Sequence, residues 1–310
     1  MQLLIPFAST LSEAGTHALR DLPLPQLGQL LAVLAPGERL GDDEYSLSPP
    51  HERALATAWG WRADDGALPW AALHAQGDGI ATGEHAWGEL TPVHWHVGRD
   101  HISLADPQAL KLDDVQSREF LEAIRPLFAS ESWQLAFGAA TRWYAAHDTL
   151  AGLPCASLDR VIGRNVDLWL PPHPQARLIR RLQNEVQMLL YDHPLNDARE
   201  ARGELPVNSF WLSGCGRPQP ASWSDAPQVD DSLRAPALAE DWAGWADAWR
   251  ALDAGPVSGM LAKARRGEAV HLVLCGERHA QRFQSARQST WQRLTRHWRS
   301  APVHDVLEAL

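Results

Sequence analysis

The amino-acid sequence predicts an α/β fold, with a largely parallel sheet flanked by helices and a small α+β unit inserted into it. Two observations predict this class. Short apolar runs of strand length alternate with amphipathic helical patterns over most of the chain. Between residues 91 and 147 this alternation gives way to a β-β-α-β-β pattern. We therefore expect an α/β core domain made of residues 1–90 and 148–310, and an inserted α+β subdomain at residues 91–147.

The core strands are predicted from continuous apolar runs that end in small or polar residues. The best candidates for the centre of the parallel sheet are residues 2–8, 207–212 and 270–275. Helical spacing of apolar residues predicts helices, in order, at 25–34, 50–59, 68–75, 173–191, 240–252, 256–266, 291–299 and 303–310. Segments rich in Gly, Pro, Ser or Asp are expected to be loops, at 36–50, 77–88 and 217–236.

The inserted unit combines a hairpin, a helix and two further strands. The hairpin is expected to turn at Gly98-Arg99-Asp100. Asp113 or Asp114 is the expected N-cap residue of the helix, because a carboxylate accepts a free N–H of the first helical turn. The predicted elements are strands at 93–97 and 101–105, a helix at 113–128, and strands at 133–137 and 142–146.

Composition excludes several classes of function. The chain has 310 residues and a formal net charge of −10, which disfavours bulk binding to nucleic acid and to anionic membrane surfaces. No apolar run is long enough to cross a bilayer, and the first apolar run lacks the features of a signal peptide. We therefore expect a cytoplasmic protein. The three cysteines, Cys155, Cys215 and Cys275, are expected to be reduced and mostly buried, with Cys215 structural rather than catalytic.

A candidate ligand-binding site lies where a predicted helix end meets a predicted strand end. Ligands of parallel α/β folds bind outside the carboxyl ends of strands, and glycines there allow a close approach of the backbone. An arginine pair with backbone amides suits a phosphate or a carboxylate. The alternative is that the asparagines and the histidine cap helix ends while the arginines face solvent. The candidate residues are His193, Asn196, Arg199, Arg202, Asn208, Gly214, Gly216 and Arg217.

The same block resembles a known family. It is similar to a block of the archaeal-type cofactor-independent phosphoglycerate mutases in His193-Pro194-Leu195-Asn196, Arg199, Gly203, Pro206, Asn208, Trp211 and Gly214-Cys215-Gly216-Arg217. Over most of its length the chain resembles more closely a proteobacterial phosphoglycerate-mutase-like family, also called regulatory protein RpfE. That likeness rests on residues 184–190 and 207–212, and on Pro92-Val93-His94-Trp95, Arg142-Trp143-Tyr144, Ile162-Gly163-Arg164 and Cys275-Gly276-Glu277-Arg278.

The resemblance implies an alkaline-phosphatase-like core with two divalent metals and a Ser or Thr nucleophile. Paired metals stabilise the attacking and leaving oxygens of a phosphoryl transfer. This chain departs from that pattern at three places. The metal-binding Asp-Gly after the first strand is replaced by Ile5-Pro6-Phe7-Ala8, and the nucleophile position by Leu24-Pro25-Gln26-Leu27-Gly28. The Asp-His pair expected near the last strand is replaced by Gly276-Glu277-Arg278-His279. We therefore expect a degenerate core without the two-metal site, and no cofactor.

Three functions remain open. The preferred one is a non-catalytic protein with a regulatory role or a small phosphorylated or carboxylate ligand. The alternative is a metal-dependent phosphoglycerate mutase or related phosphohydrolase that uses Mn²⁺ or Zn²⁺, with Glu277 and His279 as weak ligand candidates beside His193 and an Asp of residues 225–231. The third is a scaffold for a protein partner, using the tryptophans of residues 242–249 or 291–298, although a buried core stripe is the simpler interpretation of the first set.

Overall fold

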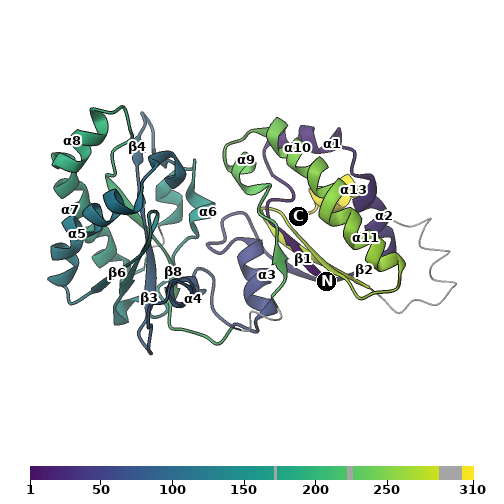
Figure 1. The fold of residues 1–310 in the computed structure, drawn as a ribbon, viewed down its shortest axis with the longest axis horizontal. Coiled ribbons are helices and arrows are strands. Elements are labelled where there is room, and N and C mark those ends of the chain that lie inside the picture. Colours follow the sequence, from purple (N-terminus) through teal and green to yellow (C-terminus); the bar gives the residue numbers. More distant parts are fainter. Residues whose placement is uncertain (171–172, 222–225, 286–301) are drawn as a thin grey trace. The chain divides into compact units, whose positions relative to one another are not determined.

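The computed structural model describes residues 1–170, 173–221, 226–285 and 302–310 (Figure 1). Within them the chain forms two compact units, which we describe separately: unit 1 is residues 1–60 with 222–310, and unit 2 is residues 61–221. Unit 2 contains the segment 91–147 together with residues on both sides of it, because the strand Trp87–Val93 pairs with the strand Ser209–Gly216. The described residues contain no helix that is long and apolar enough to cross a membrane. The helix predicted at 291–299 lies outside the described residues.

Unit 1 is built on a five-stranded sheet in the order β2-β11-β10-β1-β9. Its centre is parallel, since β1 (Gln2–Ile5) pairs with β10 (His271–Cys275) and with β9 (Gln228–Val229). The strands β11 (His279–Ser285) and β2 (Leu34–Gly41) add antiparallel pairs on one side. The sheet is therefore mixed, where the sequence predicts a largely parallel one.

Strand β2 lies where a loop was expected. Pro36 and Gly37 are typical of a loop, yet they lie in β2, which forms one edge of the sheet. An edge strand pairs on one side only, so a proline there removes no ladder bond on the other side. The pairing with β11 therefore outweighs the local preference for a loop.

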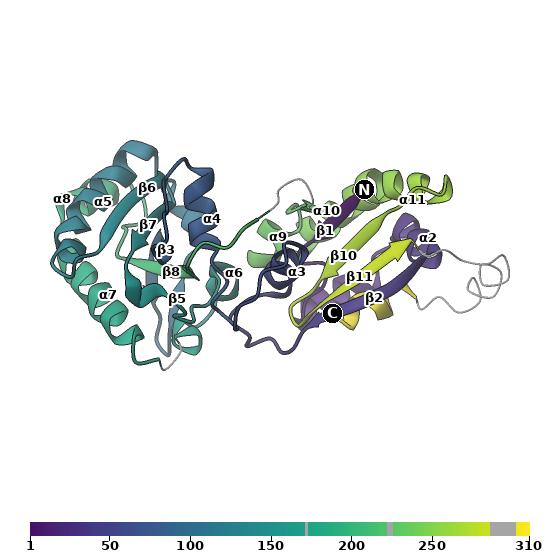
Figure 2. The ribbon, with the colours of Figure 1, turned by 90° about the horizontal axis from the view of Figure 1, so that it is seen from below.

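Helices cover the two faces of the unit 1 sheet unequally (Figure 2). Leu3 and Ile5 of β1 face the main core, and Leu4 faces α3 (Pro50–Ala58) on the opposite side. The tryptophan stripe of α10 is confirmed as core, because Trp245 and Trp249 are fully buried. The elements that pack into the main core are α1 (Glu13–Arg20), α2 (Pro25–Val33), α10 (Trp242–Leu252), the π-helical turn η5 (Asp253–Val257), α11 (Ser258–Arg265) and α13 (Val303–Glu308). The short helix α9 (Arg234–Leu238) precedes α10.

Unit 2 is built on a four-stranded antiparallel sheet in the order β6-β7-β3-β8. The prediction that residues 207–212 lie at the centre of a parallel sheet with residues 2–8 is wrong. Instead β8 (Ser209–Gly216) is an edge strand here and pairs with β3 (Trp87–Val93), a strand that the sequence analysis did not predict. The other two strands are β6 (Gln134–Ala139) and β7 (Arg142–Ala146).

Helices of unit 2 pack on both faces of this sheet. The helix α4 (Trp70–Gly77) lies against β3 and β8, and α5 (Asp114–Ala129) and α7 (Ala176–Tyr191) pack into the larger core on the other face. The hairpin of β4 (Trp95–Val97) and β5 (Ile102–Leu104) is confirmed, as is Asp113 as the N-cap residue of α5. The remaining elements are η1 (Pro107–Leu110), η2 (Asp148–Leu150), α6 (Leu158–Val161), η3 (Val166–Trp169) and α8 (Pro194–Glu200).

Candidate functional site

The carboxyl ends of β1 and β10 adjoin in unit 1, as parallel pairing requires. The carboxylate of Glu277, two residues beyond β10, accepts hydrogen bonds from the Thr10 hydroxyl and from the Leu11 backbone N–H, both at 2.9 Å to Oε1. Ligands of parallel sheets bind at such strand ends. One carboxylate oxygen of Glu277, in the loop after β10, therefore ties that loop to the loop that follows β1.

Glu277 and His279, the two weak metal-ligand candidates, belong to no group of three possible ligands among the described residues. His279 lies in β11, opposite Gly41, and its Nδ1 is buried without a hydrogen-bond partner among the described residues. Burial lowers the pKa of His279, and the charges of Arg39 and Arg278 lower it further. A site flanked by two arginines repels a cation, and the described residues hold no group of three His, Cys, Asp or Glu side chains with metal-site geometry. The side chains around Glu277 and His279 that the structure describes therefore do not fit a two-metal centre.

The helix that follows β1 differs from the one expected. It is α1, at Glu13–Arg20, whose N-cap Ser12 accepts the Gly15 N–H at 3.0 Å. Residues 24–28, which stand at the nucleophile position of the resemblance, carry no hydroxyl group, whereas Ser12 at the start of α1 carries one. At α2 the first free amides are already bonded, because Asp253 accepts from Leu27 N at 2.7 Å and from Gln26 N at 3.1 Å. A helix N-terminus is a natural anion site, and here the chain's own carboxylate occupies it.

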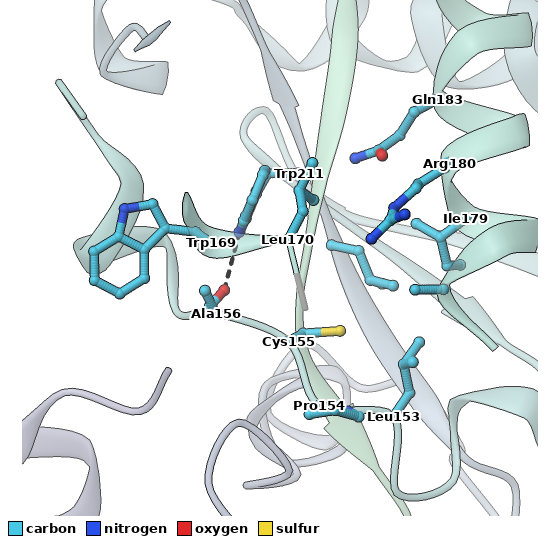
Figure 3. A pocket seen from close by; sticks show the side chains of 12 residues that line it. Leu153, Pro154, Cys155, Ala156, Trp169, Leu170, Ile179, Arg180, Gln183 and Trp211 are labelled. Atoms are coloured by element: carbon cyan, nitrogen blue, oxygen red, sulfur yellow. Dashed lines mark hydrogen bonds between the residues drawn. The ribbon is translucent and has the colours of Figure 1, made fainter. Parts of the chain in front are cut away.

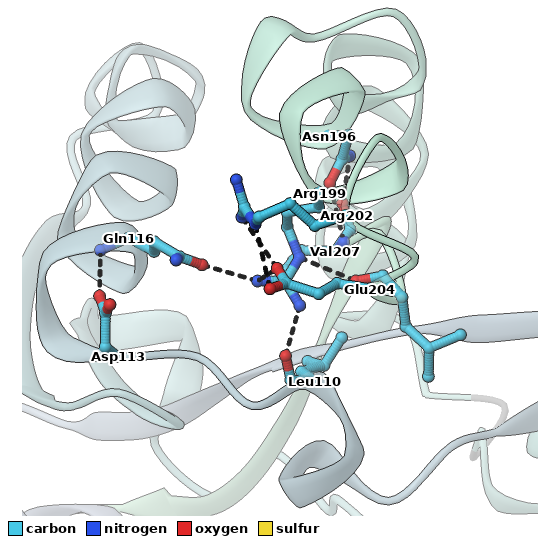
Figure 4. Close-up of polar contacts among 9 residues, drawn as sticks. Leu110, Asp113, Gln116, Asn196, Arg199, Arg202, Glu204 and Val207 are labelled. Atoms are coloured by element: carbon cyan, nitrogen blue, oxygen red, sulfur yellow. Dashed lines mark hydrogen bonds and ion pairs between the residues drawn. The ribbon is translucent and has the colours of Figure 1, made fainter.

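Arg199 of α8 lies buried in the interior of unit 2 (Figure 4). Its side chain is 1% exposed and donates to Leu205 O at 2.8 Å, to Gln116 Oε1 at 2.7 Å and to Leu110 O. Glu204 lies 3.4 Å away and supplies the countercharge. Burial lowers the pKa of Arg199, while Glu204 opposes that shift. The guanidinium thus joins α8, α5 and the end of η1.

The neighbouring asparagines are also engaged by backbone. Asn196 donates to Leu190 O and Val207 O, both at 2.8 Å, and accepts from Val207 N at 2.9 Å. Asn208 accepts from Trp95 N at 2.7 Å and donates to Trp95 O at 2.9 Å. His193 is the N-cap residue of α8. His193 thus takes the capping role that the sequence analysis kept as the alternative, and the two asparagines join backbone segments instead of capping a helix.

The rest of the block lies at the other end of β8. At about 3.3 Å per residue, β8 separates Asn208 from Arg217 by roughly 30 Å, so the two arginine-bearing ends do not form one cluster. Arg217 bonds to Glu84 O and to Asp148 at 3.2 Å. Gly214 has a φ of +63°, and a Cβ there would lie 2.8 Å from Ala71 N, so this glycine lets α4 pack against β8. A Cβ at Gly216 would lie 2.9 Å from Cβ of Pro69, so this position also suits a glycine. At the first end of the block, near Arg199, Arg202 pairs with Glu204 at 2.8 Å.

A groove in unit 1 was missed by the sequence analysis. It lies on the sheet face that also carries α3, has a volume of ≈ 250 Å³, and is lined by both polar and apolar side chains. Arg282 Nη2 lies 3.4 Å from Nδ1 of His271, and both line the groove with Gln2, Glu38 and Thr57. The signal was the alternation of polar residues along 279–285, which the sequence analysis did not recognise as a strand.

The pKa values of His271 and His279 predict how stability depends on pH. Burial lowers the pKa of His271, and the charges of Arg282 and the Met1 amino group add to the shift. Both histidines thus have a folded-state pKa below about 6.5, the value of an unfolded chain. The unfolded chain then binds more protons, so we expect the free energy of unfolding to fall as pH drops through 6.5 toward 5. Urea unfolding at pH 7.5, 6.5 and 5.5 measures this, and the double variant His271→Asn, His279→Asn should flatten the profile. An unchanged slope in that variant would assign the effect to other groups.

Comparisons with known proteins give a distant relationship. No protein-family model matches this sequence. The chain is 26% identical over 129 residues to a probable 2,3-bisphosphoglycerate-independent phosphoglycerate mutase of Geobacter sulfurreducens, and the match covers 41% of this chain and 32% of that protein. The match therefore spans about a third of the curated relative.

Two solved structures also match. One is a cofactor-independent phosphoglycerate mutase from Thermoplasma acidophilum DSM 1728, with 14% identity, a TM-score of 0.38, and coverage of 99% of this chain and 98% of that chain. The other is a protein from Pyrococcus horikoshii, with 12% identity, a TM-score of 0.46, and coverage of 92% of this chain and 87% of that chain.

Proposed function

We propose that this chain is a non-catalytic, phosphoglycerate-mutase-like protein that binds a small phosphorylated or carboxylate ligand in the cytoplasm. The distant similarity to a phosphoglycerate mutase supplies the ligand class. One observation carries the non-catalytic part: the chain's own carboxylates occupy the positions where the chemistry is expected. Glu277 is bonded to Thr10 and Leu11, and Asp253 is bonded to the first amides of α2. The regulatory role implied by the resemblance to the RpfE family is part of the same proposal.

The ligand is placed in the groove of unit 1 rather than at residues 193–217. Arg199 and Asn196 have donors committed to backbone or side-chain acceptors, and Arg202 is paired with Glu204. Arg282 and His271 instead line an open groove with the amide of Gln2. An anion there would meet the Arg282 charge and would favour the protonated form of His271. Glu38 also lines the groove, so the Arg282 charge must outweigh that carboxylate when an anion binds.

The activity test is conversion of 3-phosphoglycerate to 2-phosphoglycerate by the full chain with excess Mn²⁺. We expect no turnover above the buffer rate, and no Mn²⁺ or Zn²⁺ retained after gel filtration. Turnover that scales with protein concentration and survives repeated purification would contradict the non-catalytic proposal and favour the metal-dependent enzyme.

The binding test uses 3-phosphoglycerate with thermal-shift and NMR measurements. We expect a saturable rise in the melting temperature of wild-type protein and a raised pKa of His271 in the complex. Arg282→Ala should lose this rise. Arg250→Ala is the matched control, because Arg250 is an exposed arginine of the same unit, paired with Asp247 on α10. A rise that persists in Arg282→Ala would place the ligand elsewhere, and no rise in wild type would contradict ligand binding.

A further inference from the structure

Two cysteines that are distant in sequence lie together in unit 2. Sγ of Cys155 is 3.5 Å from Sγ of Cys215, although 60 positions separate them. Cys155 lies between η2 and α6, and its backbone N–H donates to Gly66 O at 2.9 Å. Cys215 lies in β8, and its neighbours Ser213 and Gly216 both pair with β3. Backbone bonds therefore hold both residues in place, and the sulfur contact belongs to the folded unit.

The two thiols differ in their access to solvent. Cys155 is half-buried and lines a pocket together with Trp169, Arg180 and Trp211 (Figure 3). Cys215 is fully buried. Burial raises the pKa of the Cys215 thiol, and its hydrogen bond with Cys155 raises it further. A reagent from solvent thus meets Cys155 first, and Cys215 stands behind it as a protonated thiol.

We propose that Cys155 and Cys215 form a dithiol site that reacts with hydroperoxides, in which Cys155 is the attacked residue and Cys215 the resolving residue. This assignment rests on the sulfur contact and the difference in burial, and it does not depend on the proposed anion binding. The pocket wall is mostly apolar with the Arg180 side chain among its lining residues, so it suits small or apolar hydroperoxides. Cysteines of this kind pair an accessible sulfur with a nearby resolving thiol.

The reaction proceeds in two balanced steps. The sulfur of Cys155 attacks one oxygen of the hydroperoxide, so an S–O bond forms, the O–O bond breaks, and water or an alcohol leaves with the thiol proton. Cys155 is then a sulfenic acid, oxidised by two electrons. The sulfur of Cys215 attacks the sulfur of Cys155, an S–S bond forms, the S–O bond breaks, and hydroxide leaves with the Cys215 proton as water.

The third cysteine supplies an internal control. Cys275 lies in unit 1, fully buried at the end of β10, and burial raises the pKa of its thiol. Cys275 is a free cysteine, and no other sulfur bonds to it among the described residues. We therefore expect oxidation to spare it.

The test treats the reduced, full-length chain with one equivalent of hydrogen peroxide and follows its intact mass and non-reducing peptide map. We expect the mass to fall by two hydrogen atoms, a cross-link between the peptides of Cys155 and Cys215, and a Cys275 that remains open to alkylation after unfolding. Cys155→Ser should abolish the loss of mass. Cys215→Ala should instead leave a product heavier by one oxygen atom, which dimedone traps at Cys155.

Circular dichroism of each variant confirms that the fold persists before the comparison is made, and Cys275→Ala should react as wild type does. The proposal is overturned if wild-type Cys155 accumulates sulfinic or sulfonic acid without the cross-link. It is also overturned if Cys275 is oxidised as fast as Cys155, because the contact between the two sulfurs would then give no selectivity.

Discussion

Replacement of Arg199 by alanine is expected to lower the free energy of unfolding of unit 2 by about 3 to 5 kcal/mol, because each buried acceptor that loses its donor costs about 1 to 3 kcal/mol. The variant leaves the carbonyl groups of Leu110 and Leu205 without the donors they have in the native protein. It also removes one of the two arginines that pair with Glu204. Urea unfolding followed by circular dichroism, with hydrogen exchange at the amides of β8, measures the loss.

Arg202→Ala is the matched control, because Arg202 shares Glu204 but its side chain is 46% exposed. Exposed ion pairs contribute little to stability, so we expect almost no change. Arg199→Lys should not restore stability, since one ammonium group cannot reproduce the fork of a guanidinium that reaches three acceptors. A stable Arg199→Ala variant that loses binding of 3-phosphoglycerate would instead support Arg199 as a ligand-binding residue.

Replacement of Asp253 by alanine is expected to destabilise unit 1 by about 2 to 4 kcal/mol. The carboxylate is buried and accepts from the backbone of Gln26 and Leu27, so its loss leaves two amides at the start of α2 without an acceptor. Each unsatisfied buried donor costs about 1 to 3 kcal/mol, and the negative charge is also lost from the positive end of the helix dipole. Thermal or urea unfolding of the variant measures the effect.

Asp253→Asn should lose less than Asp253→Ala, because the amide keeps one acceptor oxygen for these N–H groups. Asp247→Ala on α10 is the surface control, since that carboxylate is exposed and pairs with exposed Arg250. Equal loss of stability in the Asn and Ala variants would show that the charge, rather than the hydrogen bonds, fixes the start of α2. No loss in either variant would contradict the role of Asp253 as the distant cap.

Local patterns predicted several elements well. The hairpin of β4 and β5 follows from its turn residues, and α5 follows from its amphipathic pattern and the N-cap at Asp113. The parallel pairing of β1 and β10 follows from two continuous apolar runs. In these elements the residues that decide the structure lie within a few positions of each other.

The weaker predictions concern elements whose local sequence pattern is faint or does not identify their partner strand. Helix α1 has only eight residues, with a glycine inside, and its sequence pattern is faint until Ser12 is seen to cap it. Strand β2 contains loop-forming residues and exists because β11 pairs with it. Strand β8 was placed in the wrong sheet, because an apolar run shows that it is buried but not which strand is its neighbour.

The candidate site likewise has features that follow from the sequence and features that depend on distant segments. The sequence by itself determined that polar residues concentrate at positions 193–217, that Glu277 and Arg278 follow β10 instead of an Asp-His pair, and that the apolar stripe of α10 lies in the core. Only the tertiary structure decided where the polar side chains point. Arg199 meets the carbonyl of a residue 89 positions away, and Asp253 caps a helix 226 positions away. Such partners are set by how distant segments pack together, because a buried polar group bonds to whichever acceptor the fold brings within reach.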